Sequence, residues 1–134
     1  EDARLRQSLI ALFLLHPELA SLAKTSGRKL QPAAEIELVA HYMAAVYLQS
    51  MWRIRLGYYL PALISLPDFF SQSLQLPSPQ DEYGKTGLYA LAEWHTRFAQ
   101  QQRANHLSEY QGVADLLFGR LKMKARRHEF SLAS

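Results

Sequence analysis

Close pairs of glutamate and histidine are the residues of this sequence whose types and spacing come nearest to metal chemistry. The pairs are Glu37 with His41, Glu93 with His95, and His106 with Glu109. Imidazole and carboxylate groups are common metal ligands in proteins. A di-iron site in a helical bundle needs Glu-x-x-His on two helices together with further glutamates, and this pattern is absent. We therefore expect hydrogen-bonded histidines and exposed glutamates, with no metal and no cofactor.

Nucleophilic catalysis has less support still. The sequence contains neither a Gly-x-Ser-x-Gly motif nor a glycine-rich phosphate loop. Gly84-Lys85-Thr86 looks like the end of such a loop, but Pro79 stands where the first glycine belongs. Cysteine is absent, which removes thiolate nucleophiles, thiolate metal sites and disulfides. We predict no catalytic residues and do not expect an enzyme.

Aromatic side chains gather between residues 42 and 70 and could line a ligand cavity. Aromatic residues at helical spacing usually form a core. The alternative is a cavity between helices that takes a small apolar or planar ligand. Arg53 would then meet an acid group of that ligand, or it would instead complement a helix C-terminus. The candidate ligand-binding residues are Tyr42, Trp52, Arg53, Tyr58 and Tyr59.

Two glycines lie seven residues apart within an apparent helix, at Gly112 and Gly119. Each glycine destabilises a helix interior by up to about 1 kcal/mol relative to alanine. Close approach of another helix, from this chain or from a partner, would compensate for that loss. A break in the helix at either glycine is the competing explanation. We take Gly112 and Gly119 as candidate interface residues.

A basic segment follows this helix and contains Lys122, Lys124, Arg126 and Arg127. Cations are favoured at a helix C-terminus by the helix dipole, which is the simplest explanation. The same residues could contact the phosphates of nucleic acid, with binding that weakens steeply as salt rises, or an anionic surface. These four residues are therefore candidate nucleic-acid or anionic-surface contacts.

Helices must position all of these residues, because no alternating strand pattern occurs. Apolar residues recur at helical spacing in segments 5–15, 35–56, 88–98 and 107–121. Pro17 should split the first helix, while Gly27 and Gly57 should end the first and the central helix. Segment 60–74 predicts two short helices that begin at its prolines, and Pro77–Gly84 predicts a surface loop outside the bundle.

The segment 35–56 carries two apolar stripes, which is typical of a helix packed on more than one side. We expect Met43, Val46 and Trp52 to be largely buried in it. Replacement of a buried Trp52 by alanine would then lower the free energy of unfolding by about 3–5 kcal/mol.

Composition favours one folded domain. Of 134 residues, 49% are hydrophobic and 20% charged, enough apolar surface for a core without cross-links. We assign residues 1–134 to a single domain with a basic tail at 122–134. The net charge of +3 comes largely from that tail. The chain has no apolar run long enough to cross a membrane and starts at Glu1 without methionine, so we interpret it as a cytoplasmic fragment or processed form.

The segment from Leu9 to Ala20, LIALFLLHPELA, resembles the first two helices of the helicase-binding C-terminal domain of bacterial primases. It also resembles bacterial helical domains that often follow a membrane anchor. The primase resemblance does not continue from Glu35 onward, so it assigns no partner and no activity to particular residues.

The sequence as a whole predicts an all-α fold, a compact helical bundle of five to six helical segments. We expect a non-catalytic interaction module that works through protein–protein association, with a protein partner or a second copy. One alternative is a sensor of a small apolar ligand with an aromatic-lined cavity. The other is a nucleic-acid-associated accessory protein that binds through the basic tail.

Overall fold

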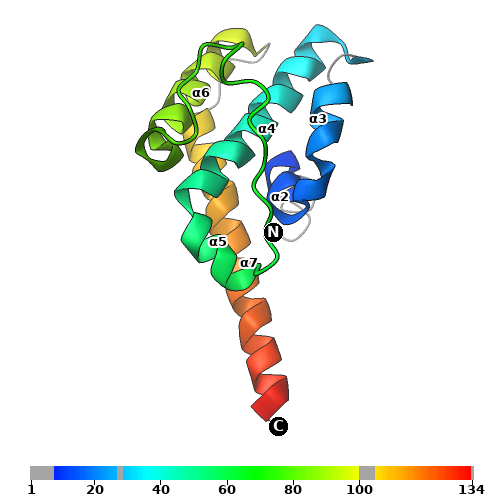
Figure 1. The fold of residues 1–134 in the computed structure, drawn as a ribbon, viewed down its shortest axis with the longest axis vertical. Helices are drawn as coiled ribbons and strands as arrows, with labels where there is room; N and C mark the ends of the chain where they lie inside the picture. Colours follow the sequence, from blue (N-terminus) through cyan, green and yellow to red (C-terminus); the bar gives the residue numbers. More distant parts are fainter. Residues whose placement is uncertain (1–7, 27–28, 100–104, 134) are drawn as a thin grey trace.

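A long central helix organises this protein. The computed structural model describes residues 8–26, 29–99 and 105–133. In that part of the chain six α-helices and no strand are found, which confirms the all-α bundle. The helix α4 (Pro32–Met51) passes through the middle, between α2 (Leu9–Leu15) with α3 (Ala20–Ser26) and α6 (Lys85–Phe98) with α7 (His106–Ala133), as Figure 1 shows. The short α5 (Arg53–Tyr59) follows α4 directly.

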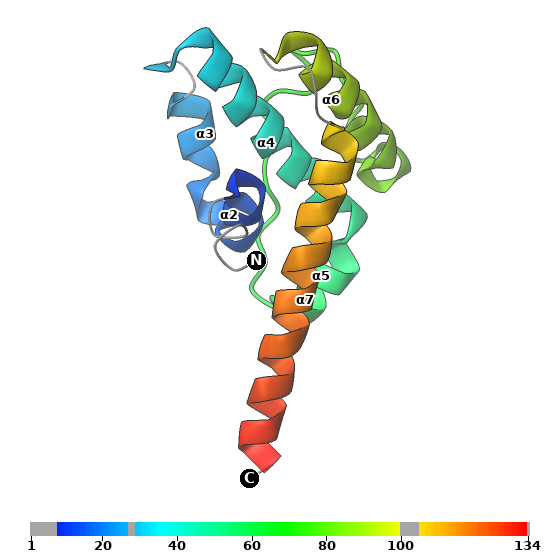
Figure 2. The ribbon, with the colours of Figure 1, turned by 180° about the vertical axis from the view of Figure 1, so that it is seen from behind.

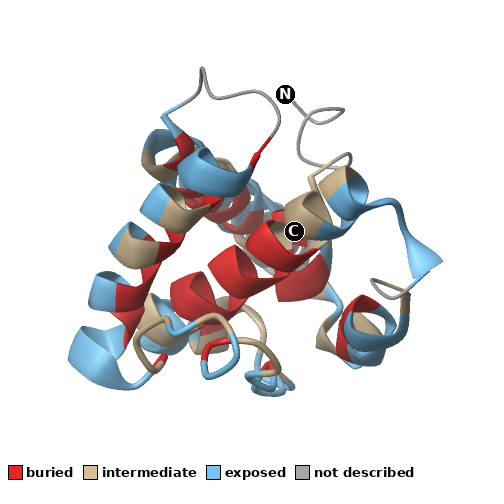
Figure 3. Cartoon of the chain, turned by 90° about the horizontal axis from the view of Figure 1, so that it is seen from above, coloured by how far each residue is buried: buried red, intermediate tan, exposed pale blue. Residues whose placement is uncertain are grey.

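The core lies along α4, as the two apolar stripes predict. Met43 and Val46 are 0% and 4% exposed, and the rings of Tyr42 and Tyr47 are fully buried. The buried residues of α4 run from Val39 to Gln49, and Figure 3 shows the buried segments gathered in the middle of the bundle with exposed residues around them. None of the described helices is both long and apolar enough to cross a membrane.

The first helical region is split, as Pro17 predicts. The helix α2 ends before His16, the 3-10 helix η1 (Pro17–Leu19) begins with the proline, and α3 follows. Ser8 begins α2, and its side chain accepts a hydrogen bond from the Ala11 amide. The predicted stop at Gly27 lies outside the described residues.

The end of the central helix differs from the sequence prediction. Trp52 interrupts it with φ −114° and ψ 24°, and helical structure then resumes through Gly57 to Tyr59. Gly57 is therefore not a helix terminator. The helix stops just before Pro61, whose ring disfavours helical backbone at Leu60. Trp52, expected to be largely buried, is 38% exposed at this junction.

The two short helices predicted in segment 60–74 are not formed; the backbone turns at 61–62, has no regular secondary structure through 63–68 and turns again at 69–75. Buried side chains of α4 satisfy this backbone instead of helical hydrogen bonds. The Gln49 amide donates to the Ile64 carbonyl and accepts from the Leu66 amide, at 2.9 and 2.7 Å. The Tyr42 hydroxyl donates to the Pro67 carbonyl at 2.6 Å.

The segment Pro77–Gly84 lies partly at the surface, as predicted, since residues 81–83 are exposed, but it is also hydrogen-bonded to the core. The Tyr47 and Ser50 hydroxyls donate to the carbonyls of Pro77 and Pro79. Its last residues form the 3-10 helix η3 (Asp81–Gly84), and Gly84 has φ +89°, a conformation that glycine adopts without strain. A β-carbon at Gly84 would also come within 2.6 Å of the Tyr47 carbonyl oxygen. This loop therefore fixes the start of α6 against α4.

Candidate functional site

The helix α7 presents the most distinctive surface of the described structure. It runs without interruption from His106 to Ala133, and its last turns extend past all the other helices (Figure 2). Tyr110, Ala114, Leu117 and Leu121 face the core and are 1–8% exposed. Beyond Leu121 the helix continues for twelve residues, about 18 Å, which we call the distal arm (residues 122–133).

The two glycines singled out in the sequence lie on the opposite side of α7 from the core. The helix is regular at both positions, so the predicted alternative of a helix break is wrong. A β-carbon added at Gly112 or at Gly119 would meet no described atom within 4 Å. Close packing against another described helix of this chain is therefore not the reason for either glycine.

Larger apolar residues alternate with the two glycines. Leu116 follows Gly112 by four residues, Gly119 follows by three more, and Met123 by another four. These spacings keep all four positions on one side of an α-helix. Met123 is 54% exposed and Leu116 is partly exposed. We call these four residues, Gly112, Leu116, Gly119 and Met123, the α7 stripe.

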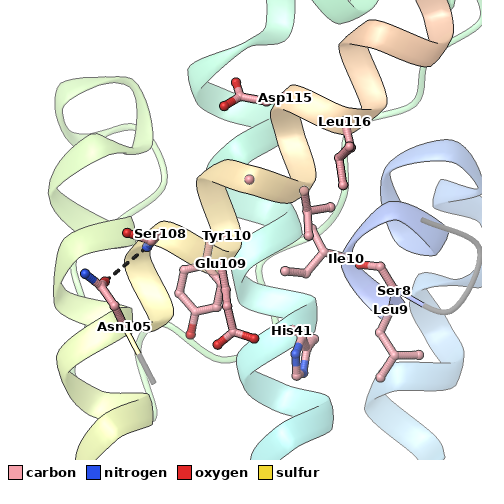
Figure 4. A pocket seen from close by; sticks show the side chains of 12 residues that line it. Ser8, Leu9, Ile10, His41, Asn105, Ser108, Glu109, Tyr110, Asp115 and Leu116 are labelled. Carbon is pink, nitrogen blue, oxygen red and sulfur yellow. Dashed lines mark hydrogen bonds between the residues drawn. The ribbon is translucent and has the colours of Figure 1, made fainter. Parts of the chain in front are cut away.

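A cleft of about 860 Å³ opens beside the first half of this stripe, between α2 and α7 with α4 at its base (Figure 4). Its apolar wall includes Leu9 and Ile10 from α2 and Leu116 from α7. In Figure 4 Glu109 from α7 and His41 from α4 both line this cleft, with the Glu109 carboxylate drawn near the His41 ring. Gly112 also lines this cleft, so the backbone of α7 is accessible there.

Charge is divided unequally along α7. Its first half carries the carboxylates Glu109 and Asp115, which both line the cleft and are exposed. Between Asp115 and Glu129 no side chain carries a carboxylate. The basic candidates Lys122, Lys124, Arg126 and Arg127 are all exposed along the distal arm, beyond the body of the bundle. The helix is therefore acidic beside the cleft and basic along its arm.

A buried histidine, not predicted as a central feature, ties α7 to the rest of the bundle. Nε2 of His95 donates to the Glu37 carboxylate at 2.7 Å, and Nδ1 accepts from the Tyr110 hydroxyl at 2.6 Å. The His95 side chain is 2% exposed. Burial lowers the pKa of His95 below its ordinary value, while the hydrogen bond to Glu37 opposes this change. Burial likewise raises the pKa of Tyr110. Neutral His95 thus joins α4, α6 and α7.

The second half of this network is His106, which stacks on His95 with ring centroids 3.7 Å apart. Its Nδ1 donates to Glu109 at 3.1 Å. The glutamates and histidines that are paired in the sequence therefore come together in part. One network contains Glu37, His95, His106 and Glu109, whereas Glu93 is exposed. Among the described residues no group of three or more His, Cys, Asp or Glu is placed to hold a metal ion.

The candidate ligand-binding residues do not converge on one cavity. Tyr42 is a core residue whose ring contacts Phe13, Phe69 and Phe70. Arg53 donates to the Ser65 hydroxyl at the surface, and Tyr58 is 75% exposed with its ring against Tyr59. A shallower groove of about 440 Å³, between α4, α6 and the segment around Phe70, contains none of the five candidates.

No family model, curated protein or solved structure matches this chain. The similarity of residues 9–20 to the primase domain therefore receives no support from the comparisons.

Proposed function

We propose that this protein is a non-catalytic interaction module that works by protein–protein association through the α7 stripe. The observation that carries this proposal is the open space beyond Gly112 and Gly119 in an uninterrupted helix. Glycine weakens a helix, and no described part of the chain packs against these two positions. A partner that packs closely against the backbone of α7 is the remaining physical compensation.

Exposed apolar side chains on the neighbouring α5 support the same proposal. Ile54 and Tyr58 are 93% and 75% exposed and are four residues apart, so they share one face of α5. Trp52, which directly precedes this helix, meets the ring of Phe118 on α7 edge-on at 5.8 Å, and the guanidinium of Arg55 lies over the same ring at 4.0 Å. Covering such side chains by a partner removes apolar surface from water, which favours association.

The two alternative functions have weaker support. A ligand sensor needs an enclosed cavity lined by aromatic residues of the central helix, yet Tyr42 and Tyr47 fill the core. A nucleic-acid accessory role rests on the distal arm alone, which offers a single basic helix rather than a basic face across the domain.

Native mass spectrometry of the protein purified from its source tests the association. We expect the protein with its natural sequence to appear in a complex, and the variant Gly112→Leu/Gly119→Leu to lose that complex while its circular dichroism shows unchanged or higher helix content. Ser21→Leu is the control, since it adds a leucine at an exposed position of α3, which among the described helices packs on α4 and not on α5 or α7. A monomer without partner, or normal assembly by the double variant, contradicts the proposal.

A further inference from the structure

The order of small and large residues in the α7 stripe makes it complementary to the same stripe on an antiparallel helix. Read along the chain, small and large residues alternate: Gly112, Leu116, Gly119, Met123. In an antiparallel pair of such helices every large side chain faces a glycine. Met123 of each copy faces Gly112 of the other, and Leu116 faces Gly119. A parallel pair would place glycine against glycine and leave space between the helices.

The charges beside the stripe fit the same register. Glu109 and Arg127 are about five helical turns apart and so lie on one side of the stripe, while Asp115 and Lys122, about two turns apart, lie on the other side. When Leu116 faces Gly119, Arg127 lies about 1.5 Å along the axis from the level of Glu109 in the second copy. Lys122 lies about 3 Å from the level of Asp115. Both flanks therefore pair opposite charges, whereas parallel helices would bring the basic arms together.

The cleft lies where the arm of a second copy would run and would receive part of it. In this register residues 119–127 of one copy run alongside residues 108–116 of the other, where Gly112 and Leu116 form one wall and Leu9 and Ile10 form the other. The arm extends past its own bundle, so its own helices do not cover it (Figure 2). The acidic residues Glu109 and Asp115 line the cleft that would receive the basic arm.

We propose that two copies of this chain form a two-fold antiparallel dimer, in which the start of the distal arm of each copy lies in the α2–α7 cleft of the other. This inference rests on the proposed function and adds to it the partner, the orientation and the register. A two-fold axis makes the interface the same patch on both copies. Each dimer contains two Gly112–Met123 contacts and two Leu116–Gly119 contacts.

Analytical ultracentrifugation of the purified full chain over a range of concentrations tests the dimer. We expect reversible dimerisation, and for Gly112→Leu a dissociation constant at least tenfold higher, since leucine would collide with Met123 of the second copy. Met123→Ala alone should also weaken the dimer, because it removes an apolar contact. Combined with Gly112→Leu, however, Met123→Ala should strengthen it, because it restores the space. This change of sign is specific to the register; Ser21→Leu, at an exposed position of α3, is the control.

A charge exchange tests the register independently. Glu109→Arg and Arg127→Glu each place like charges together at both ends of the interface, so each variant should dimerise more weakly. Mixing the two variants should give heterodimers, because both flanking pairs are then opposite in charge. Lys124→Glu makes the same change as Arg127→Glu at a position that faces away from the stripe, and it should not form heterodimers preferentially with Glu109→Arg.

The outcomes separate this inference from the proposed function. A chain that stays monomeric at all concentrations overturns the dimer, and the proposed function then stands only if the source protein shows a complex with another protein that Gly112→Leu/Gly119→Leu removes. A dimer that is insensitive to Gly112→Leu and shows no preference in mixing overturns the register proposed here. If purified and source proteins are both monomeric and partner-free, both proposals are wrong.

Discussion

The ring of Tyr47 occupies the place where residue 87 would carry a side chain. A β-carbon built on Gly87 would lie 2.0 Å from Cε1 of Tyr47, so α6 can approach α4 only because residue 87 is glycine. The hydroxyl of the same tyrosine donates to the Pro77 carbonyl at 2.8 Å, which prevents the ring from turning away freely. Gly87, like Gly84, is therefore a glycine that close packing requires, in contrast to Gly112 and Gly119.

Replacing Gly87 by alanine should destabilise the protein. We expect Gly87→Ala to lower the free energy of unfolding by about 1–3 kcal/mol, because the added methyl group overpacks against Tyr47. Gly57→Ala should instead raise it by up to about 1 kcal/mol, since alanine favours the helix and the space there is open. Urea unfolding followed by circular dichroism measures both. Equal effects of the two substitutions would contradict this packing.

The central helix should respond unequally to truncation at its middle and at its end. Met43 is fully buried, so Met43→Ala should lower the free energy of unfolding by about 2–5 kcal/mol. Trp52 is 38% exposed, and we now expect Trp52→Ala to cost less than the 3–5 kcal/mol of a fully buried tryptophan. The denaturant midpoints of the two variants, compared where the slope of the unfolding transition is unchanged, measure the two losses. A larger loss at Trp52 than at Met43 would be inconsistent with the fold.

Acidification should weaken the fold through His95. Because burial lowers its pKa, the folded protein holds His95 neutral where the unfolded chain already binds a proton. Stability due to this residue is thus complete above about pH 6.5, the ordinary value for histidine, and is lost as the pH falls from there towards the folded pKa. His95→Gln should show a shallower loss between pH 7.5 and 5.5 in urea unfolding. A His95→Gln variant that keeps the slope of the parent protein would contradict this explanation.

Salt should weaken the proposed dimer moderately. The pairs of Glu109 with Arg127 and of Asp115 with Lys122 would lie at the edge of the interface, where ions screen them. We expect the dissociation constant to rise by roughly a few-fold between 50 and 500 mM sodium chloride, as edge ion pairs are individually weak. Sedimentation at several salt concentrations measures it. The variant Lys122→Gln/Arg127→Gln should dimerise more weakly, and its dissociation constant should depend little on salt. A strong remaining salt dependence would contradict the proposed ion pairs.

The sequence by itself determined the helical class and much of the core. Helical periodicity depends on neighbours three and four residues away, so the long helices around Met43 and Leu117 could be predicted from local pattern. The break at Pro17 is equally local, because the proline ring itself limits the backbone. The two glycines of α7 could be singled out in the same way, although the reason for their use could not.

Only the tertiary structure decided which residues meet across the bundle. His95 contacts Glu37 from 58 residues away and Tyr110 from 15, and no periodic pattern encodes such a pair. The non-helical course of segment 60–74 depends on hydrogen bonds from Gln49 and Tyr42, which override the local preference for helix at its prolines. Whether a glycine admits a neighbour or faces open space, as at Gly87 and Gly112, depends on the packing of distant helices, because contact is a property of the folded chain.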